Sequence, residues 1–275
     1  MRATMYFGSR ERMAWVKCPA IDSTISKIRW NAKSDFLNGG ATVRNSSTGH
    51  KEYQFSWNLA SAEDIHSIVD YADGLYGNGP FYFLDPFAEN TNLLPQYWAT
   101  PRLAVDDAPP FTLDKRPTLV DTATNTFNYP TKSAVYTFIT GDTFTSLWIP
   151  VPAGYTFHFG AHGTATSTAA VILTPDGGSA SAVTLLTPTT STRTNTSITS
   201  TTGVTISFQG AGLLTLAGMM AQVLPNGQTV PTGNFISGRG NSGVQFLGSP
   251  VLNGYSSALD KQSANATLVE IGAWL

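Results

Sequence analysis

The chain has 275 residues, of which 12% are charged, and its formal net charge is −2. This length fits one large domain or two ordinary ones, and so small a net charge gives no electrostatic basis for binding nucleic acid or an anionic membrane. The single cysteine, Cys18, excludes an internal disulfide framework and a multi-cysteine metal site.

The first residues lack the apolar run of a signal peptide, and no window reaches the ~20 apolar residues of a membrane span. We therefore expect a protein that is made in the cytoplasm without a cleaved signal. Threonine, serine, glycine and asparagine replace the missing charge. This mixture suits short strands and tight turns, and it suits surfaces that are buried against other subunits.

Strands dominate the first 60 residues. Residues 51–59 alternate so that Tyr53, Phe55, Trp57 and Leu59 share one face of an amphipathic strand. A register slip of one residue would expose four large apolar groups, so the facing of this strand is firmly specified. Upstream, the turn signal Asn38-Gly39-Gly40 predicts a hairpin.

One helix is predicted, starting at Ser61. Ser61 can cap it, Asp64 stands three residues on as a capping-box variant, and apolar residues recur at helical spacing as far as Leu75. Gly74 or Gly77 can end it. Asp64 and His66 are interpreted as solvated residues, because positions two apart on a helix do not face each other.

An aromatic-rich stretch runs from Gly77 to Pro101. Residues 81–84 predict a buried strand, which Asp85-Pro86 ends because proline cannot donate to a sheet ladder. The chain then leaves as an arm with more apolar side chains than one helix and one sandwich can cover. We expect this arm to dock on a neighbouring subunit through Phe87, Leu93, Leu94, Tyr97 and Trp98.

The middle of the chain, residues 102–233, predicts an antiparallel β-sandwich. Short strand signals recur there almost without helical signals, and proline- and glycine-rich turns at 150–154 and 175–178 separate them. Residues 187–202 are rich in threonine and serine and predict an exposed loop or a long hairpin.

The last segment predicts a return to the first domain. Residues 234–241 are rich in glycine and polar side chains, and the apolar strand pattern of residues 266–274 needs a sheet to join. The expected fold is thus mainly β, with two antiparallel β-sandwich domains. Residues 1–101 with 234–275 form the first, which carries one flanking helix, and residues 102–233 form the second, which is inserted into the first.

Residues that could carry chemistry are scattered. His158 and His162 lie on a predicted strand without a nearby carboxylate or thiolate to complete a metal ligand set, and Asp106-Asp107 has no partner at a fixed distance. No nucleophile elbow, zinc-protease motif or P-loop is present. We therefore expect no catalytic, metal or cofactor site. Trp148 and Tyr155 are either sugar-stacking residues or part of the sandwich core.

Four longer segments carry a resemblance. They read HKEYQFSWNLAS, YADGLYGNGPFYFLDPFAENTNLLPQYWATP, WIPVPAGYTFHFGAHG, and SGRGNSGVQFLGSPVLNGYSSALDKQSANATLVEIGAWL. Together they resemble minor tail proteins of tailed phages that infect actinobacteria, over most of the chain. The N-terminal order of strand, helix and aromatic strand ending at Asp85-Pro86 is similar to the ring-forming domain of siphophage distal tail proteins.

This resemblance implies a structural virion protein at the tail tip without enzymatic activity. It implies a homo-oligomeric ring around the tail axis, six copies being favoured over three, that links the tail tube to other tail-tip proteins. A galectin-like or carbohydrate-module-like sandwich would face outward. The alternatives are a carbohydrate-binding adhesin that contacts host cell-wall glycan, and a cell-wall-degrading enzyme, which lacks a fixed acid–base pair.

Overall fold

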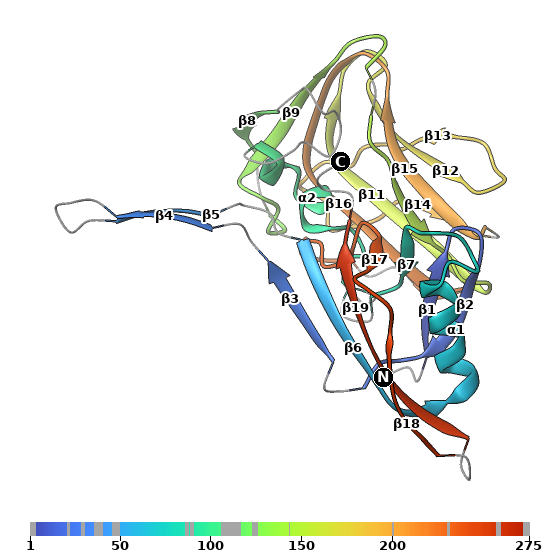
Figure 1. Cartoon of the computed structure of the whole chain (residues 1–275). Helices are drawn as coiled ribbons and strands as arrows, with labels where there is room; N and C mark the ends of the chain where they lie inside the picture. The colour runs from blue at the N-terminus through green and yellow to red at the C-terminus, as the bar shows by residue number, and fades with distance from the viewer. Residues whose placement is uncertain are drawn as a thin grey trace. The chain divides into compact units, whose positions relative to one another are not determined.

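The computed structural model describes residues 4–20, 23–28, 31–35, 41–45, 50–85, 88, 91–105, 117–122, 126–142, 144–199, 201–229, 232–256 and 260–271. Antiparallel sheets with few helices confirm the mainly β fold class (Figure 1). The chain divides into two compact units. Unit 1 comprises Met1–Leu84 and Gly243–Leu275, and unit 2 comprises Asp85–Ser242.

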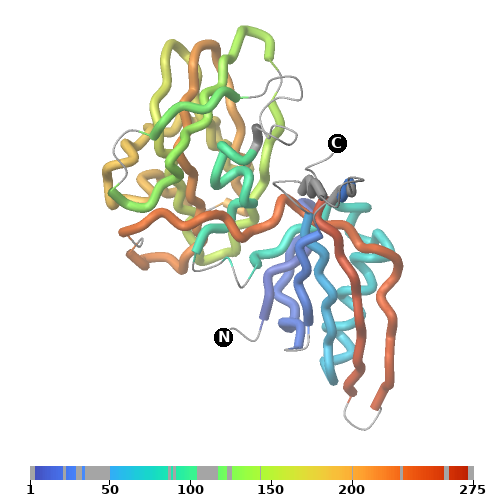
Figure 2. The backbone as a smooth tube through the Cα atoms, turned by 90° about the vertical axis from the view of Figure 1, so that its left-hand side faces the viewer, coloured from blue at the N-terminus to red at the C-terminus, as the bar shows by residue number. Residues whose placement is uncertain are grey.

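Unit 1 is built on an eight-stranded sheet. Seven of its strands follow the order β2-β1-β7-β17-β19-β6-β3, and β18 pairs with β19 off this path. Their bounds are Thr4–Ser9 (β1), Met13–Lys17 (β2), Thr24–Ile28 (β3), His50–Ser61 (β6), Phe81–Phe83 (β7), Val244–Phe246 (β17), Val251–Ser256 (β18) and Lys261–Glu270 (β19). Figure 2 shows the C-terminal strands, in red, beside β6, in light blue.

A separate two-stranded sheet pairs β4 (Asn31–Asp35) with β5 (Ala41–Asn45). The turn predicted at Asn38-Gly39-Gly40 lies outside the described residues.

Strand β6 places its aromatic side chains in the core of unit 1. Tyr53, Phe55 and Trp57 are buried against the neighbouring strands and the helix, as the alternation predicts. The prediction is wrong for Leu59, whose side chain is 56% exposed. The register of β6 against β19 shifts between Trp57 and Ala60, and this irregularity turns Ala60 inward in place of Leu59.

The long helix α1 (Ala62–Ala72) begins directly after the predicted cap Ser61 and ends shortly before the predicted stop Gly74. The Ser61 hydroxyl accepts the backbone N–H of Asp64, and the chain leaves the helix through Gly74, at φ +80°. The helix buries Ile65, Ile68 and Tyr71 in the core that β6 lines.

Unit 2 contains a five-stranded sheet of order β14-β11-β16-β9-β8 and a four-stranded sheet of order β10-β15-β12-β13. The first has the strands Thr118–Asp121 (β8), Lys132–Phe138 (β9), Tyr155–Ala165 (β11), Thr196–Ile198 (β14) and Gly212–Pro225 (β16). The second has Leu147–Pro150 (β10), Ala170–Pro175 (β12), Ser181–Ala182 (β13) and Gly203–Gln209 (β15).

The two sheets of unit 2 face each other across an apolar core. Phe138 on β9 lies 6.5 Å, between ring centroids, from Phe208 on β15, and Phe157 and Phe159 on β11 are fully buried. The inner face of β11 and β16 is therefore apolar, and the residues between these positions form an outer face.

The aromatic arm belongs to unit 2, so the unit boundaries differ from the predicted ones at 101/102 and 233/234. The contact-based boundaries fall at 84/85 and 242/243. The N–H of Leu93 donates to the carbonyl oxygen of Ala221 on β16, and Trp98 stacks on Phe208. Trp98 lies in the short helix α2 (Gln96–Ala99), which the 3-10 helix η1 (Pro101–Val105) follows.

Candidate functional site

Among the described residues, β2, β3 and β18 of the unit 1 sheet each pair with one neighbouring strand and leave their other edge open, and two of them, β3 and β18, are almost entirely exposed. All five residues of β3 are exposed, and β6 is the one strand that pairs with it among the described residues. Five of the six residues of β18 are exposed, and it pairs with β19. A strand edge of this kind presents unpaired backbone N–H and C=O groups to any further strand.

The apolar face of the sheet continues to both of these edges. Ile25 on β3 lies opposite the buried Tyr53, and Leu252 on β18 lies opposite the buried Ala264. Residues directly opposite each other in a ladder share a face. Ile25 is 39% exposed and Leu252 is 44% exposed, so the core face ends in uncovered apolar side chains at two places.

A row of polar side chains lies on the outer face of the five-stranded sheet in unit 2. His158 and His162 on β11 both point to this face, and Gln222 on β16 lies opposite His158. His158 Nδ1 is 2.8 Å from the hydroxyl oxygen of Ser197, and His162 Nε2 is 2.9 Å from the carbonyl oxygen of Thr192. Ser197 lies opposite His158 on the neighbouring strand β14, and Thr192 lies in the loop that precedes β14, so loop backbone contacts this face at His162.

Gln222 is a functional candidate that the sequence interpretation missed. Its side chain is fully buried, and its amide has no hydrogen-bond partner in the part of the chain that the structure describes. A polar residue within the apolar run Met219–Leu224 was the available signal. A buried amide without a partner costs about 1–3 kcal/mol, so this position weakens unit 2 locally.

Burial also determines the electrostatics of this row. The Tyr129 ring lies 4.6 Å from the His162 ring, and burial raises the pKa of Tyr129 to about 12 while the nearby Arg193 guanidinium opposes the rise. Burial lowers the pKa of His162 below its ordinary 6.5. The row is thus uncharged at neutral pH apart from Arg193.

We predict that unit 2 loses stability in acid through His162. Burial lowers the pKa of His162 in the folded state, so the unfolded chain binds a proton before the folded chain does as the pH falls. The contribution of neutral His162 to the stability of unit 2 is complete above the unfolded-state pKa of about 6.5 and is lost as the pH falls below it. His162→Gln should therefore flatten the fall in melting temperature between neutral and mildly acid pH. His66→Gln, on the exposed face of α1, is the control and should keep the wild-type slope. An unchanged slope in His162→Gln would contradict this role of burial.

Trp148 is not available for sugar stacking, which corrects one of the two residues proposed for it. Its side chain is 5% exposed, and its indole N–H donates to Asp176 Oδ2 at 2.9 Å. Gly203 lies against its ring, where a Cβ atom would come within 2.3 Å of the indole. Tyr155, at the start of β11, is half-buried.

The proposed docking arm is also buried inside unit 2. The side chains of Leu93, Leu94, Tyr97 and Trp98 are at most 7% exposed, and Phe87 lies outside the described residues. Asn92 holds the segment in place, because its amide nitrogen donates to the carbonyl oxygens of Met219 and Ile236. The described part of the arm packs on β16 of its own chain, so these four buried side chains offer no free surface to a neighbour.

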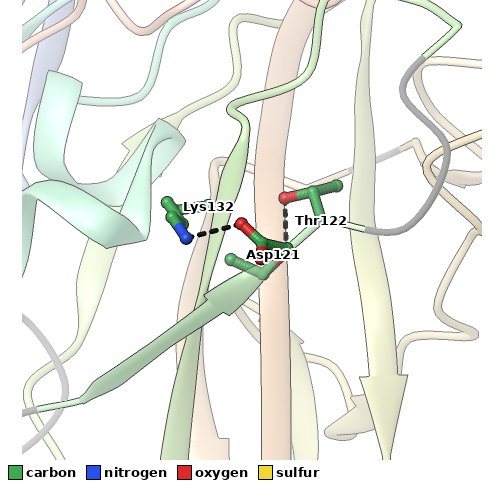
Figure 3. A network of polar contacts seen from close by, with 4 residues as sticks. Asp121, Thr122 and Lys132 are labelled. Carbon is green, nitrogen blue, oxygen red and sulfur yellow. Dashed lines mark hydrogen bonds and ion pairs between the residues drawn. The ribbon is translucent and has the colours of Figure 1, made fainter.

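Three described carboxylates of unit 2 serve local structure. Asp121 pairs with Lys132 across β8 and β9, beside the contact between Thr122 and Ser133 (Figure 3). Asp142 accepts the N–H of Ile139, and Asp176 accepts the indole N–H of Trp148. Asp106-Asp107 lies outside the described residues. Within the described ranges, no three His, Cys, Asp or Glu side chains gather as metal ligands would, and no helix is long and apolar enough to span a membrane.

Comparisons with protein families, with curated proteins and with solved structures find no match to this chain.

Proposed function

We propose that this chain is a structural virion protein of a phage tail tip that assembles as a ring around the tail axis. The observation that supports assembly is the exposure of strands β3 and β18 of the unit 1 sheet, where Ile25 and Leu252 leave the core face uncovered. Exposed apolar sheet edges are aggregation hazards unless another strand covers them. Assembly around an axis provides such a cover.

Within this proposal the two units have separate roles. Unit 1 forms the ring, of six copies or alternatively three, and links the tail tube to tip or host-binding components. Unit 2, inserted between β7 and β17 of unit 1, faces outward as a sandwich of the galectin-like or carbohydrate-module-like type. The protein performs no catalysis in this role, and it acts at the tail tip of the virion.

Labelling intact virions tests the proposed location. The turn at Asp176-Gly177-Gly178 suits a short epitope insertion, because the added chain has open space at Gly177. Gold-labelled antibody should mark the far end of the tail in electron micrographs. The turn at Gly227, which is also open, provides a second independent position within unit 2. Label on the capsid, or virions without label at either position, would exclude a tail-tip role.

A carbohydrate-binding adhesin is the alternative function. Of the two stacking residues proposed from the sequence, Tyr155 alone is partly exposed, because Trp148 is buried. A glycan array of the intact protein distinguishes the alternatives. Binding that Tyr155→Ala abolishes would assign unit 2 a direct role in host contact, and binding is not required for the ring.

A further inference from the structure

Residues 187–194 of unit 2 form a loop whose two ends lie close together on one strand. Just before the loop, the N–H of Leu186 donates to the carbonyl oxygen of Ala161 on β11. Just after it, the N–H of Asn195 donates to the carbonyl oxygen of Phe159, two residues away on the same strand. Compact loops with such closely spaced ends frequently carry function. We call residues 187–194 the covering loop.

The covering loop rests directly on the outer face of the five-stranded sheet. A Cβ atom at Gly160 on β11 would come within 2.3 Å of the carbonyl oxygen of Arg193 and within 2.8 Å of Thr194 Cα. Glycine at this position therefore leaves the room that the loop backbone occupies. Two residues farther along β11, the Nε2–H of His162 donates to the carbonyl oxygen of Thr192, because a carbonyl oxygen can only accept. The loop thus contacts the face at Gly160 and at His162.

In this closed position several buried polar atoms of the loop and the sheet have no hydrogen-bond partner within the described ranges. They are Nε2 and Oε1 of Gln222, Oγ1 of Thr194 and Nε of Arg193. Gln222 lies opposite His158 and diagonal to Gly160, on which the loop rests. A buried donor or acceptor without a partner pays its full desolvation penalty, and opening of the loop relieves that penalty by admitting water or a ligand. The closed position is therefore one that the polar groups themselves oppose.

The face that an open loop uncovers combines polar groups with aromatic rings. Gln222 brings an amide that can both donate and accept, and His162 brings a ring N–H. The Tyr129 ring lies 4.6 Å from the His162 ring and 5.2 Å from the Phe235 ring, between centroids. Arg193 is the one charged group of this row, and it leaves the face with the loop. Amide and imidazole groups beside aromatic rings, without a charge, suit a ligand that carries hydroxyl groups and a C–H face, which is the chemistry of a neutral saccharide.

We propose that the covering loop opens and that the uncovered face binds a neutral saccharide through Gln222 and His162, beside the ring of Tyr129. The ligand then takes the place of the loop as the partner of these groups. This site goes beyond the ring proposed above and does not depend on it, because it lies within unit 2. It is also distinct from the stacking surface considered at Tyr155, which starts β11.

A reversible disulfide in the full-length protein tests this site. Thr192 in the loop and Thr232 lie opposite each other in an isolated antiparallel bridge, a spacing that suits a disulfide. On a Cys18→Ala background, Thr192→Cys combined with Thr232→Cys should hold the loop closed when oxidised and release it when reduced. The probe is an array of immobilised neutral and acidic oligosaccharides. The reduced protein should bind neutral oligosaccharides, and oxidation should weaken this binding by roughly tenfold or more, because it removes the binding-competent state.

A second disulfide and a second variant complete the test. Asp121→Cys with Lys132→Cys, opposite each other on β8 and β9, is the control pair, and its oxidation should leave binding unchanged. Gln222→Leu removes the amide and keeps the loop, so it should slow hydrogen exchange of the amides of residues 187–194 and abolish binding. Equal binding by the oxidised and reduced proteins, binding of acidic oligosaccharides alone, or no binding by either form would overturn the site. Labelling of the tail tip is unaffected by each of these results, so the site and the proposed function fail separately.

Discussion

Removing residues 266–275 should leave unit 1 unfolded while unit 2 stays folded. The deleted part of β19 pairs with β6 and β17 and contributes Ala266 and Leu268, which are buried in the unit 1 core. Loss of the Leu268 side chain alone costs about 2–5 kcal/mol, and an ordinary domain is stable by about 5–15 kcal/mol. Loss of the strand also exposes the core face of β6 and a new sheet edge.

Limited proteolysis with mass spectrometry measures this effect unit by unit. In the truncated protein, unit 1 should be cleaved rapidly and the fragment 85–242 should persist. Val251→Ala is the control, because this side chain is 59% exposed and its loss should change stability by no more than about 0.5 kcal/mol. A truncated protein that melts and resists protease like the intact one would contradict the role given to β19.

Trp148→Ala should destabilise unit 2 by about 3–5 kcal/mol, as loss of a buried aromatic side chain does. The indole fills the space against Gly203, and its N–H satisfies Asp176 Oδ2, which also accepts the hydroxyl of Thr202. The substitution leaves a cavity and removes one donor from this carboxylate. Thermal or denaturant unfolding of the full-length protein, followed by a probe in unit 2, measures the loss.

Two matched variants separate the contributions of packing and of hydrogen bonding to the loss of unfolding free energy in Trp148→Ala. Trp148→Phe keeps much of the ring and removes the N–H, so it should cost about 1–3 kcal/mol. Trp15→Ala, at a site 40% exposed on β2, should cost less than Trp148→Ala. If Trp148→Ala instead leaves the melting temperature unchanged and abolishes glycan binding, Trp148 is a stacking residue and its burial is refuted.

Local signals in the sequence predict much of unit 1. The period of two in β6 predicts which aromatics are buried, and the Ser61 cap predicts where α1 begins. The register irregularity that exposes Leu59 was not predictable from this alternation. It depends on the pairing of β6 with β19, some two hundred residues later in the chain.

The arm and Trp148 show why the candidate sites were harder to predict. Both are aromatic and flanked by prolines, a pattern that suits an exposed contact surface and a covered core equally well. The arm is buried because Asn92 and Leu93 bond to β16, and Trp148 is buried because Gly203 leaves room for it. Contacts between residues so distant in sequence leave no local periodicity.

The assembly edges were not predicted from the sequence either. Residues 24–28 and 251–256 show weak apolar alternation, and their exposure depends on the distant pairing of β6 with β19, beside which β3 and β18 each pair with one strand. Gln222 was not predicted either, because the lack of a hydrogen-bond partner for its buried amide depends on which segments pack against β16.

A reconstruction of the assembled tail tip tests the central claim, that unit 1 closes into a ring through its sheet edges, most directly. The proposed ring predicts several copies of this chain, six or alternatively three, related by rotation about the tail axis. A single copy per tail, or copies that contact other proteins alone, would contradict it.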